Sequence, residues 1–252
     1  MTMTNSSLAT KAILSESFTA PRQGTIKGVA IHCTAGSPDS TAETIARVLQ
    51  PRSRGASCNY AIGGDGSICL VVEEKNRAWC TSSGAVDHCA ISIEVASDGR
   101  GLVVRPAAVA ALIDLLVDIC RRNGIKELKW KADKRLLYRW EEQNMVVHRW
   151  TSKDGKSCPG DYLYGLHPQI AEQVNMRLKG GEDDMTEEQV REIVRQVLAE
   201  RDKEPASVWA EYALDWGMAN KITDGRKPQG YCTREQVVTM LQRLYQRLAG
   251  KE

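Results

Sequence analysis

The 252-residue sequence has a single phenylalanine and no long hydrophobic segment. Its longest apolar run, residues 107–113, is far shorter than the ~18 residues that a membrane-spanning helix needs. Residues 1–21 contain neither the basic segment nor the apolar core of a secretory signal peptide. We therefore expect no membrane insertion and no classical export signal.

Cysteine pairs of the CxxC type and clusters of basic residues are also missing. The eight cysteines have no regular spacing, which favours reduced core thiols over a disulfide framework or a four-cysteine metal site. Because the chain has no basic cluster, we expect no nucleic-acid partner. The acidic segment 182–204 leaves the rest of the chain positively charged, which modestly favours an anionic polymer as a partner.

A break in composition at residues 179–184 (KGGEDD) divides the chain, because paired glycines followed by like charges neither extend a helix nor pack into a core. We expect a first domain at residues 1–180, an acidic linker with an amphipathic helix at 181–205, and a small helical module at 206–252. The apolar stripe of that linker helix indicates either self-association or a spacer packed on a neighbour. The stripe comprises Val190, Ile193, Val194, Val197 and Leu198.

The first domain has the pattern of a mixed α/β fold, with a central sheet flanked by helices. A capping box at residues 40–43 (STAE) and Pro106 each predict the start of a helix. Strands are expected at 28–32, 60–62, 67–72, 90–95 and 145–148, and helices at 40–49, 106–123, 136–143 and 168–178. The C-terminal module is expected to be all-α, with helices at 207–219 and 233–248.

Three potential metal ligands, His32, His148 and Cys158, lie at the ends of predicted strands or in the loop that follows. Two imidazoles and a thiolate suit Zn²⁺ and leave a fourth coordination position for water. Lys156 stands two residues before the thiol in the segment 156–160 (KSCPG), where an ammonium would support a thiolate or an oxyanion. Taken singly, each histidine is as readily a core or surface residue, and Lys156 a solvated loop lysine.

Five blocks in order carry a family resemblance: VAIHCTAG (29–36), NYAI (59–62) with Asp65 and Gly66, RAW (77–79), AISIE (90–94), and VH (147–148) with KSCPG (156–160). Together they resemble the type 2, peptidoglycan-recognition-like N-acetylmuramoyl-L-alanine amidases over roughly residues 25–178. The resemblance implies a zinc hydrolase that cuts the amide bond between N-acetylmuramic acid and L-alanine in the bacterial cell wall. The competing interpretation is a non-catalytic peptidoglycan-binding receptor on the same fold.

The resemblance also implies roles for single residues. His32, His148 and Cys158 would bind zinc, Glu94 would be the general base, and Lys156 would stabilise the tetrahedral intermediate. For Glu94 the alternative is a strand-end carboxylate paired with an arginine. Asn59, Tyr60 and Trp79 are the candidate substrate contacts, although Tyr60 is also expected as a packed strand residue.

Two departures from the family pattern concern cysteines. Cys58 stands where some phage members of the family have a catalytic tyrosine, and Cys80 follows Trp79 where many relatives have a histidine. Of the remaining histidines, we expect His88 close to the groove and His167 on the surface at a helix start.

The C-terminal segment resembles a single S-layer homology motif over residues 206–248, through Trp209, Trp216, the ITDG sequence at 222–225 and TREQVV at 233–238. In that family the motif binds secondary polymers of Gram-positive walls, usually with three motifs together. The alternative is a helical hairpin that only packs against the enzyme, and a third class of function is a wall-anchored interaction protein.

The combination predicts a modular wall-lytic enzyme, namely a phage or prophage endolysin of a Gram-positive host. Without an export signal, such a protein would accumulate in the host cytoplasm and reach the wall after holin-dependent release. Self-association through residues 186–204 would gather several C-terminal modules and raise their avidity.

Overall fold

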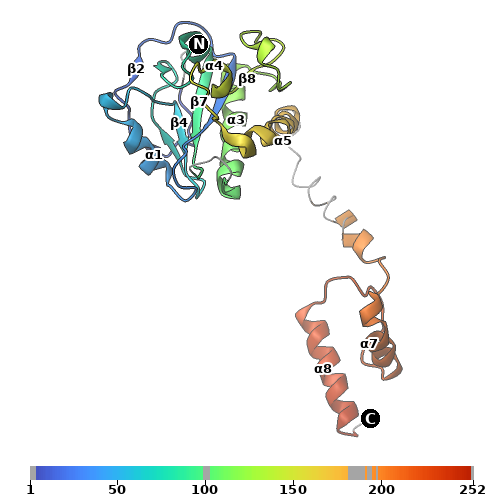
Figure 1. Cartoon of the computed structure of the whole chain (residues 1–252). Coiled ribbons are helices and arrows are strands. Elements are labelled where there is room, and N and C mark those ends of the chain that lie inside the picture. The colour runs from blue at the N-terminus through green and yellow to red at the C-terminus, as the bar shows by residue number, and fades with distance from the viewer. Residues whose placement is uncertain (1–3, 99–102, 181–190, 192–194, 197, 251–252) are drawn as a thin grey trace. The chain divides into compact units, whose positions relative to one another are not determined.

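The computed structural model divides the chain into two compact units, Met1–Glu182 and Asp183–Glu252 (Figure 1). It describes residues 4–98, 103–180, 191, 195–196 and 198–250. All described strands belong to the first unit, whereas the described elements of the second are helical. The fold class expected from the sequence, a mixed sheet flanked by helices and followed by a small all-α module, is confirmed.

A six-stranded sheet forms the centre of the first unit, in the order β1-β5-β4-β7-β3-β8. Neighbouring strands run parallel, except for the antiparallel pair β4 and β5. That pair is the predicted hairpin, whose turn contains Gly66 at a φ of +83°. The strands are β1 (Lys11–Ala12), β3 (Gly28–Cys33), β4 (Tyr60–Ile62), β5 (Ile68–Leu70), β7 (Ala90–Val95) and β8 (Met145–Val146). A separate antiparallel pair joins β2 (Phe18–Thr19) and β6 (Arg77–Ala78).

The two central parallel strands, β3 and β7, set the position of the polar side chains that matter below. Val29 and Ile31 of β3 point into the main hydrophobic core. Side chains alternate between the faces of a strand, so His32 points to the opposite face. His32 and Glu94 are register partners on the two strands. An imidazole and a carboxylate are therefore neighbours near the carboxyl ends of adjacent strands.

Helices cover both faces of the sheet (Figure 1). The long helices α3 (Pro106–Asn123) and α5 (Gly160–Lys179) pack against each other and against the main core. Helix α1 (Ala42–Leu49) packs on β4 and β5 through a second apolar cluster. The short helices α2 (Gly84–Cys89) and α4 (His148–Thr151) share a third cluster, with Ala30 of β3. Among the described helices, none is both long and apolar enough to cross a bilayer.

Two of the helix predictions are wrong, one in its existence and one in its first residue. The segment 136–143 is not a helix: a short 3-10 turn, η2 (Lys134–Leu136), ends there, and Tyr138 has a left-handed backbone with φ +74° that interrupts any helix. Helix α5 begins at Gly160 rather than at Pro168, which lies inside it. A second short 3-10 turn, η1 (Arg52–Arg54), follows α1.

Two predicted ends are also corrected. His148 does not end a strand but is the first residue of α4, because β8 stops at Val146. The N-cap of α1 is Thr41 rather than Ser40, and its hydroxyl accepts a hydrogen bond from the N–H of Thr44.

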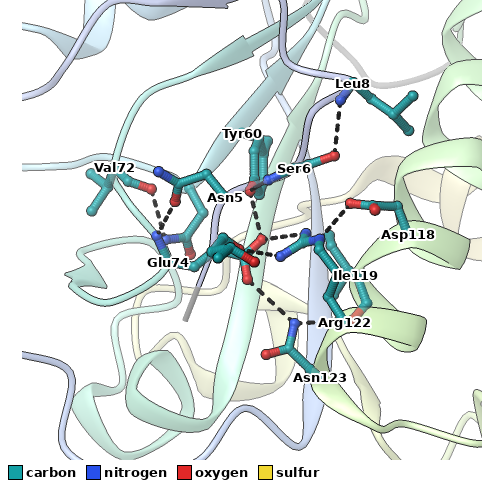
Figure 2. Close-up of polar contacts among 12 residues, drawn as sticks. Asn5, Ser6, Leu8, Tyr60, Val72, Glu74, Asp118, Ile119, Arg122 and Asn123 are labelled. Carbon is teal, nitrogen blue, oxygen red and sulfur yellow. Dashed lines mark hydrogen bonds and ion pairs between the residues drawn. The ribbon is translucent and has the colours of Figure 1, made fainter. Parts of the chain in front are cut away.

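Figure 2 shows a buried polar cluster around Glu74, which lies in the loop after β5. Its Oε1 accepts hydrogen bonds from the hydroxyl of Tyr60 at 2.5 Å and from Nη2 of Arg122 at 2.7 Å. Its Oε2 accepts one from Nδ2 of Asn123 at 3.3 Å. The N–H of Ser6 donates to the Tyr60 hydroxyl at 2.8 Å. The cluster thus joins the N-terminal segment, β4 and α3 through one carboxylate.

The second unit consists of helices α7 (Val208–Ala219) and α8 (Arg234–Leu248), which begin and end as predicted to within a residue. The N-cap of α8 is Thr233, which forms a capping box with Gln236. Ile222 is the one large apolar residue that is buried among the described residues of this unit. Exposed apolar side chains are numerous on and between both helices, including Trp209, Tyr212, Trp216, Tyr231, Leu241, Tyr245 and Leu248. Cys232, just before α8, is the exposed one of the eight free cysteines.

The predicted stripe of the linker helix falls largely outside the described residues. Of its five members the structure describes only Leu198, whose side chain is exposed. The capping box predicted at residues 186–189 also lies outside them. Self-association through this segment therefore stays a prediction.

Candidate active site

A cavity of about 720 Å³ opens at the carboxyl ends of β3 and β7. Its wall includes three sequence-predicted site residues with charged or aromatic side chains, namely Glu94, Lys156 and Trp79. It also includes His148 and Cys158, which come from α4 and from the loop before α5. The cavity therefore gathers residues that lie far apart in the sequence.

His32, His148 and Cys158 form a group that could hold a metal ion. One donor atom of each lies within 4.8 Å of the others. Sγ of Cys158 is 3.4 Å from Nδ1 of His32. The two imidazole rings lie edge to face, with centroids 5.3 Å apart. The fold thus brings the three predicted ligands together.

Both imidazoles are held in the neutral state that metal ligation requires. Burial, together with the neighbouring His148, lowers the pKa of His32 to about 3. Burial and the nearby ammonium of Lys156 lower the pKa of His148. Each ring therefore has one nitrogen with a free lone pair at neutral pH.

Two thiols meet beside the histidines. Cys33, the last residue of β3, shares a hydrogen bond with Cys158, and this bond together with burial raises the pKa of the Cys158 thiol. Cys158 must therefore release a proton on binding a metal ion. Local sequence patterns do not predict this contact, because Cys33 and Cys158 lie far apart in the chain.

Glu94 lies on the cavity wall and its side chain is partly buried. Its Oε2 is buried and has no hydrogen-bond partner in the described structure. Burial raises the pKa of the carboxyl to about 8, with a further contribution from Cys33. Sγ of Cys80 lies 4.0 Å from its Oε1, and His32, Cys80 and Glu94 make a second set of close donors. A carboxyl group with such a pKa can both accept and donate a proton near neutral pH.

Of the three residues predicted to contact substrate, one lines the cavity and two do not. Trp79 is half-buried in the cavity wall, where its Nε1 donates to Oγ1 of Thr19 at 2.8 Å and the guanidinium of Arg52 lies 4.6 Å from its ring. Tyr60 and Asn59 are fully buried and do not line this cavity. The Tyr60 hydroxyl belongs to the Glu74 cluster, and the Asn59 side chain binds backbone groups of neighbouring strands. Neither is placed for direct contact with substrate.

The other two histidines also differ from expectation. His88 does not line the cavity; its Nδ1 accepts a hydrogen bond from the N–H of Gln23 at 2.9 Å. His167 is not a surface residue at a helix start but lies fully buried within α5. Its ring is 4.3 Å from that of Trp130. His167 therefore belongs to the core.

Sequence reasoning missed Ser82, whose Oγ lies 2.9 Å from Nε2 of His148. The two residues are 66 positions apart, and the backbone of Ser82 is left-handed, with φ +59°. A TSSG sequence carries no local signal for such a contact.

The sequence profile of the family described as N-acetylmuramoyl-L-alanine amidase matches residues 22–161, which contain all five predicted metal and catalytic residues. No curated protein matches the chain.

Several solved structures are similar in chain trace to about two thirds of this chain. They include the structure of PlyL (16% identity, 65% of this chain and 95% of that chain, TM-score 0.48) and a mutant endolysin from Bacillus subtilis (17%, 65% and 98%, 0.48). A third is the N-acetylmuramoyl-L-alanine amidase LysC from Clostridium intestinale URNW (16%, 66% and 97%, 0.42). The family profile alone covers more than half of the length of this chain, and the chain therefore belongs to the N-acetylmuramoyl-L-alanine amidase family.

Proposed function

We propose that this chain is a zinc-dependent amidase that hydrolyses the bond between N-acetylmuramic acid and L-alanine in bacterial peptidoglycan. The observation that carries the proposal is the grouping of His32, His148 and Cys158, the last two on the cavity wall, beside the carboxyl group of Glu94, whose buried Oε2 has no hydrogen-bond partner. A receptor that only binds peptidoglycan would need neither the ligand set nor the carboxylate.

The three ligands suit zinc in chemistry and in spacing. Imidazole nitrogen and thiolate sulfur are donors that this ion prefers, and catalytic sites have three protein ligands. Nitrogen and sulfur donors around a tetrahedral zinc lie about 3.5 Å apart, and Nδ1 of His32 and Sγ of Cys158 are 3.4 Å apart. When bound, zinc would supply Lewis acidity and a water molecule of lowered pKa.

Glu94 is the proposed general base. Its free Oε2 takes the proton of the attacking water, and the protonated carboxyl returns that proton to the departing alanine nitrogen. The exposed ammonium of Lys156, on the cavity wall, stabilises the negative charge that develops on the carbonyl oxygen. Trp79 offers an aromatic surface to the sugar or the stem peptide.

We propose residues 1–180 as the catalytic domain, 181–205 as a linker and 206–252 as a module that binds secondary wall polymers. Exposed indole and phenol rings on α7 and α8 support the last assignment, since such rings stack on sugars while their polar atoms stay hydrated. An endolysin of a phage or prophage, released to the wall through a holin pore, is the proposed biological setting.

The test is digestion of purified Gram-positive peptidoglycan with and without a chelator, with new alanine amino termini and new reducing ends assayed in the same samples. Chelator-sensitive amino termini without reducing ends are the expected result. Reducing ends would mean that a glycosidic bond is cut. No cleavage by a folded, zinc-loaded protein would favour the receptor.

Variants separate the roles of the site residues. Glu94→Gln should lower turnover by roughly 10²- to 10⁴-fold with zinc still bound, because it removes only the proton transfer. Cys158→Ser should lose zinc, which a metal assay on the dialysed protein measures. Deletion of residues 206–252 should leave cleavage of soluble fragments intact, whereas a wall-anchored interaction protein would lose its activity.

A further inference from the structure

The loop between β6 and α2, residues 80–83, touches the proposed metal site from outside the ligand set. Oγ of Ser82 lies 2.9 Å from Nε2 of His148. The same histidine belongs to the group that could hold a metal ion. A neutral imidazole carries one N–H, so whichever nitrogen donates a hydrogen bond leaves the other with its lone pair.

This loop is anchored on both sides. The buried carboxylate of Asp87, in α2, accepts hydrogen bonds from the N–H groups of Cys80 at 3.3 Å and Thr81 at 3.0 Å. From the other side, the Thr151 hydroxyl donates to the carbonyl of Thr81. Thr151 is the last residue of α4, the helix that begins with His148. The loop and the helix are therefore joined at two points, one of which is the histidine ring.

The backbone of Ser82 is in the left-handed region, with φ +59°. Residues other than glycine, asparagine and aspartate adopt this conformation rarely, at a cost in free energy. Glycine would fit the turn without that cost, but glycine has no hydroxyl. A serine at position 82 therefore suits the hydrogen bond with His148, whereas the backbone conformation by itself would favour glycine.

We propose that Ser82 is a positioning residue for the metal site. Its hydroxyl accepts the hydrogen bond of the Nε2–H of His148, which fixes the ring orientation and leaves Nδ1 unprotonated for the metal ion. The inference rests on the proposed function in one respect, namely that His148 is a zinc ligand.

The experiment compares zinc affinity in the full-length protein, by competition with a chromophoric chelator. Ser82→Gly and Ser82→Ala should weaken zinc binding about 10- to 100-fold, as losses of outer hydrogen bonds to metal-bound histidines do. Ser82→Gly also relieves the left-handed backbone, so its melting temperature should be unchanged or higher. Ser82→Asn tolerates that backbone and offers an acceptor oxygen, so it should bind zinc within a few-fold of the wild type.

Ser83→Ala is the matched control, because its hydroxyl lies on the same loop but contacts Tyr138 and the start of α2 instead. It should keep the wild-type affinity. Imidazole nitrogen shifts in NMR spectra of the apo protein give a readout independent of activity. The wild type should show His148 protonated at Nε2, and Ser82→Gly should show a mixture of the two tautomers.

Wild-type zinc affinity in Ser82→Gly would overturn the inference while leaving the proposed function intact. Equal losses in Ser82→Gly and Ser83→Ala would also overturn it, since the loop as a whole would then be responsible. If the wild type itself binds no zinc, the proposed function fails first.

Discussion

Replacing Glu74 by alanine tests whether one buried carboxylate joins the N-terminal segment to the sheet and to α3. The side chain of Glu74 is 1% exposed, and it accepts hydrogen bonds from Tyr60, Arg122 and Asn123. Glu74→Ala removes the acceptor from all three donors and leaves the Tyr60 hydroxyl, in the core, with no group to donate to.

The expected cost follows from the partners left behind. Breaking a buried ion pair by removing one member costs about 3–5 kcal/mol. Arg122 keeps Asp118 at 2.8 Å and its side chain is 19% exposed, so the lower end, about 3 kcal/mol, applies. At about 2–4 °C per kcal/mol for a protein of this size, the melting temperature should fall by roughly 6–12 °C.

Thermal unfolding followed by circular dichroism measures this shift. Glu73→Ala is the matched control, because the neighbouring carboxylate makes only an exposed ion pair with Lys75 at 3.0 Å. That variant should lose less than about 1 kcal/mol. The double variant Glu74→Leu with Arg122→Met should be more stable than Glu74→Ala, since apolar side chains fill the space and no guanidinium is left without Glu74. Equal melting temperatures for Glu74→Ala and Glu73→Ala would refute the reasoning.

Two further predictions concern the interior of the first unit. Burial lowers the pKa of His167 to about 4, so between about pH 6.5 and pH 4 the unfolded chain binds a proton that the folded chain does not, and stability is lost as the pH falls. In His167→Phe, urea unfolding at several pH values should show that up to about 3 kcal/mol of this acid-induced loss of unfolding free energy is gone. If His167→Phe has the same pH profile as the wild type, His167 is not the group responsible. Gly28→Ala should cost about 1–3 kcal/mol or more, because its Cβ would collide with the backbone carbonyl of Asn144. Gly165 lies in α5 with open space around it, so Gly165→Ala should instead stabilise the protein by about 0.5–1 kcal/mol. If chemical denaturation shows that Gly28→Ala and Gly165→Ala destabilise the protein equally, the packing explanation is wrong.

The sequence predicted best those elements whose signals are local. The alternation in β3 and β7, the turn at Gly66 and the capping box at Thr233 each appear in the structure close to where their patterns place them. These features depend on residues a few positions apart, so a short window contains the cause.

The predictions failed where distant contacts decide the local structure. Helix α5 extends eight residues before Pro168, because Leu163 and His167 are buried there against the core. The segment 136–143 does not form a helix, because Tyr138 takes a left-handed backbone and Leu137 and Trp140 pack into the cluster with Trp150. Neither contact leaves a trace in neighbouring residues.

For the site, the family resemblance identified the residues that the fold gathers, and spacing alone would not have done so. What it missed are contacts between side chains from different loops, such as Cys33 with Cys158 and Ser82 with His148. It also placed Tyr60 and Asn59 among the substrate contacts, whereas packing within the sheet buries both.

The exposure of Cys232 has a consequence for work with the purified protein. Because this thiol is the exposed one of the eight, air oxidation should couple two chains through their C-terminal units. Such covalent pairs would imitate true self-association, so a reducing agent belongs in every sizing experiment. The same atom is an attachment point for a maleimide dye on the second unit, with which binding of the chain to cell walls can be tested.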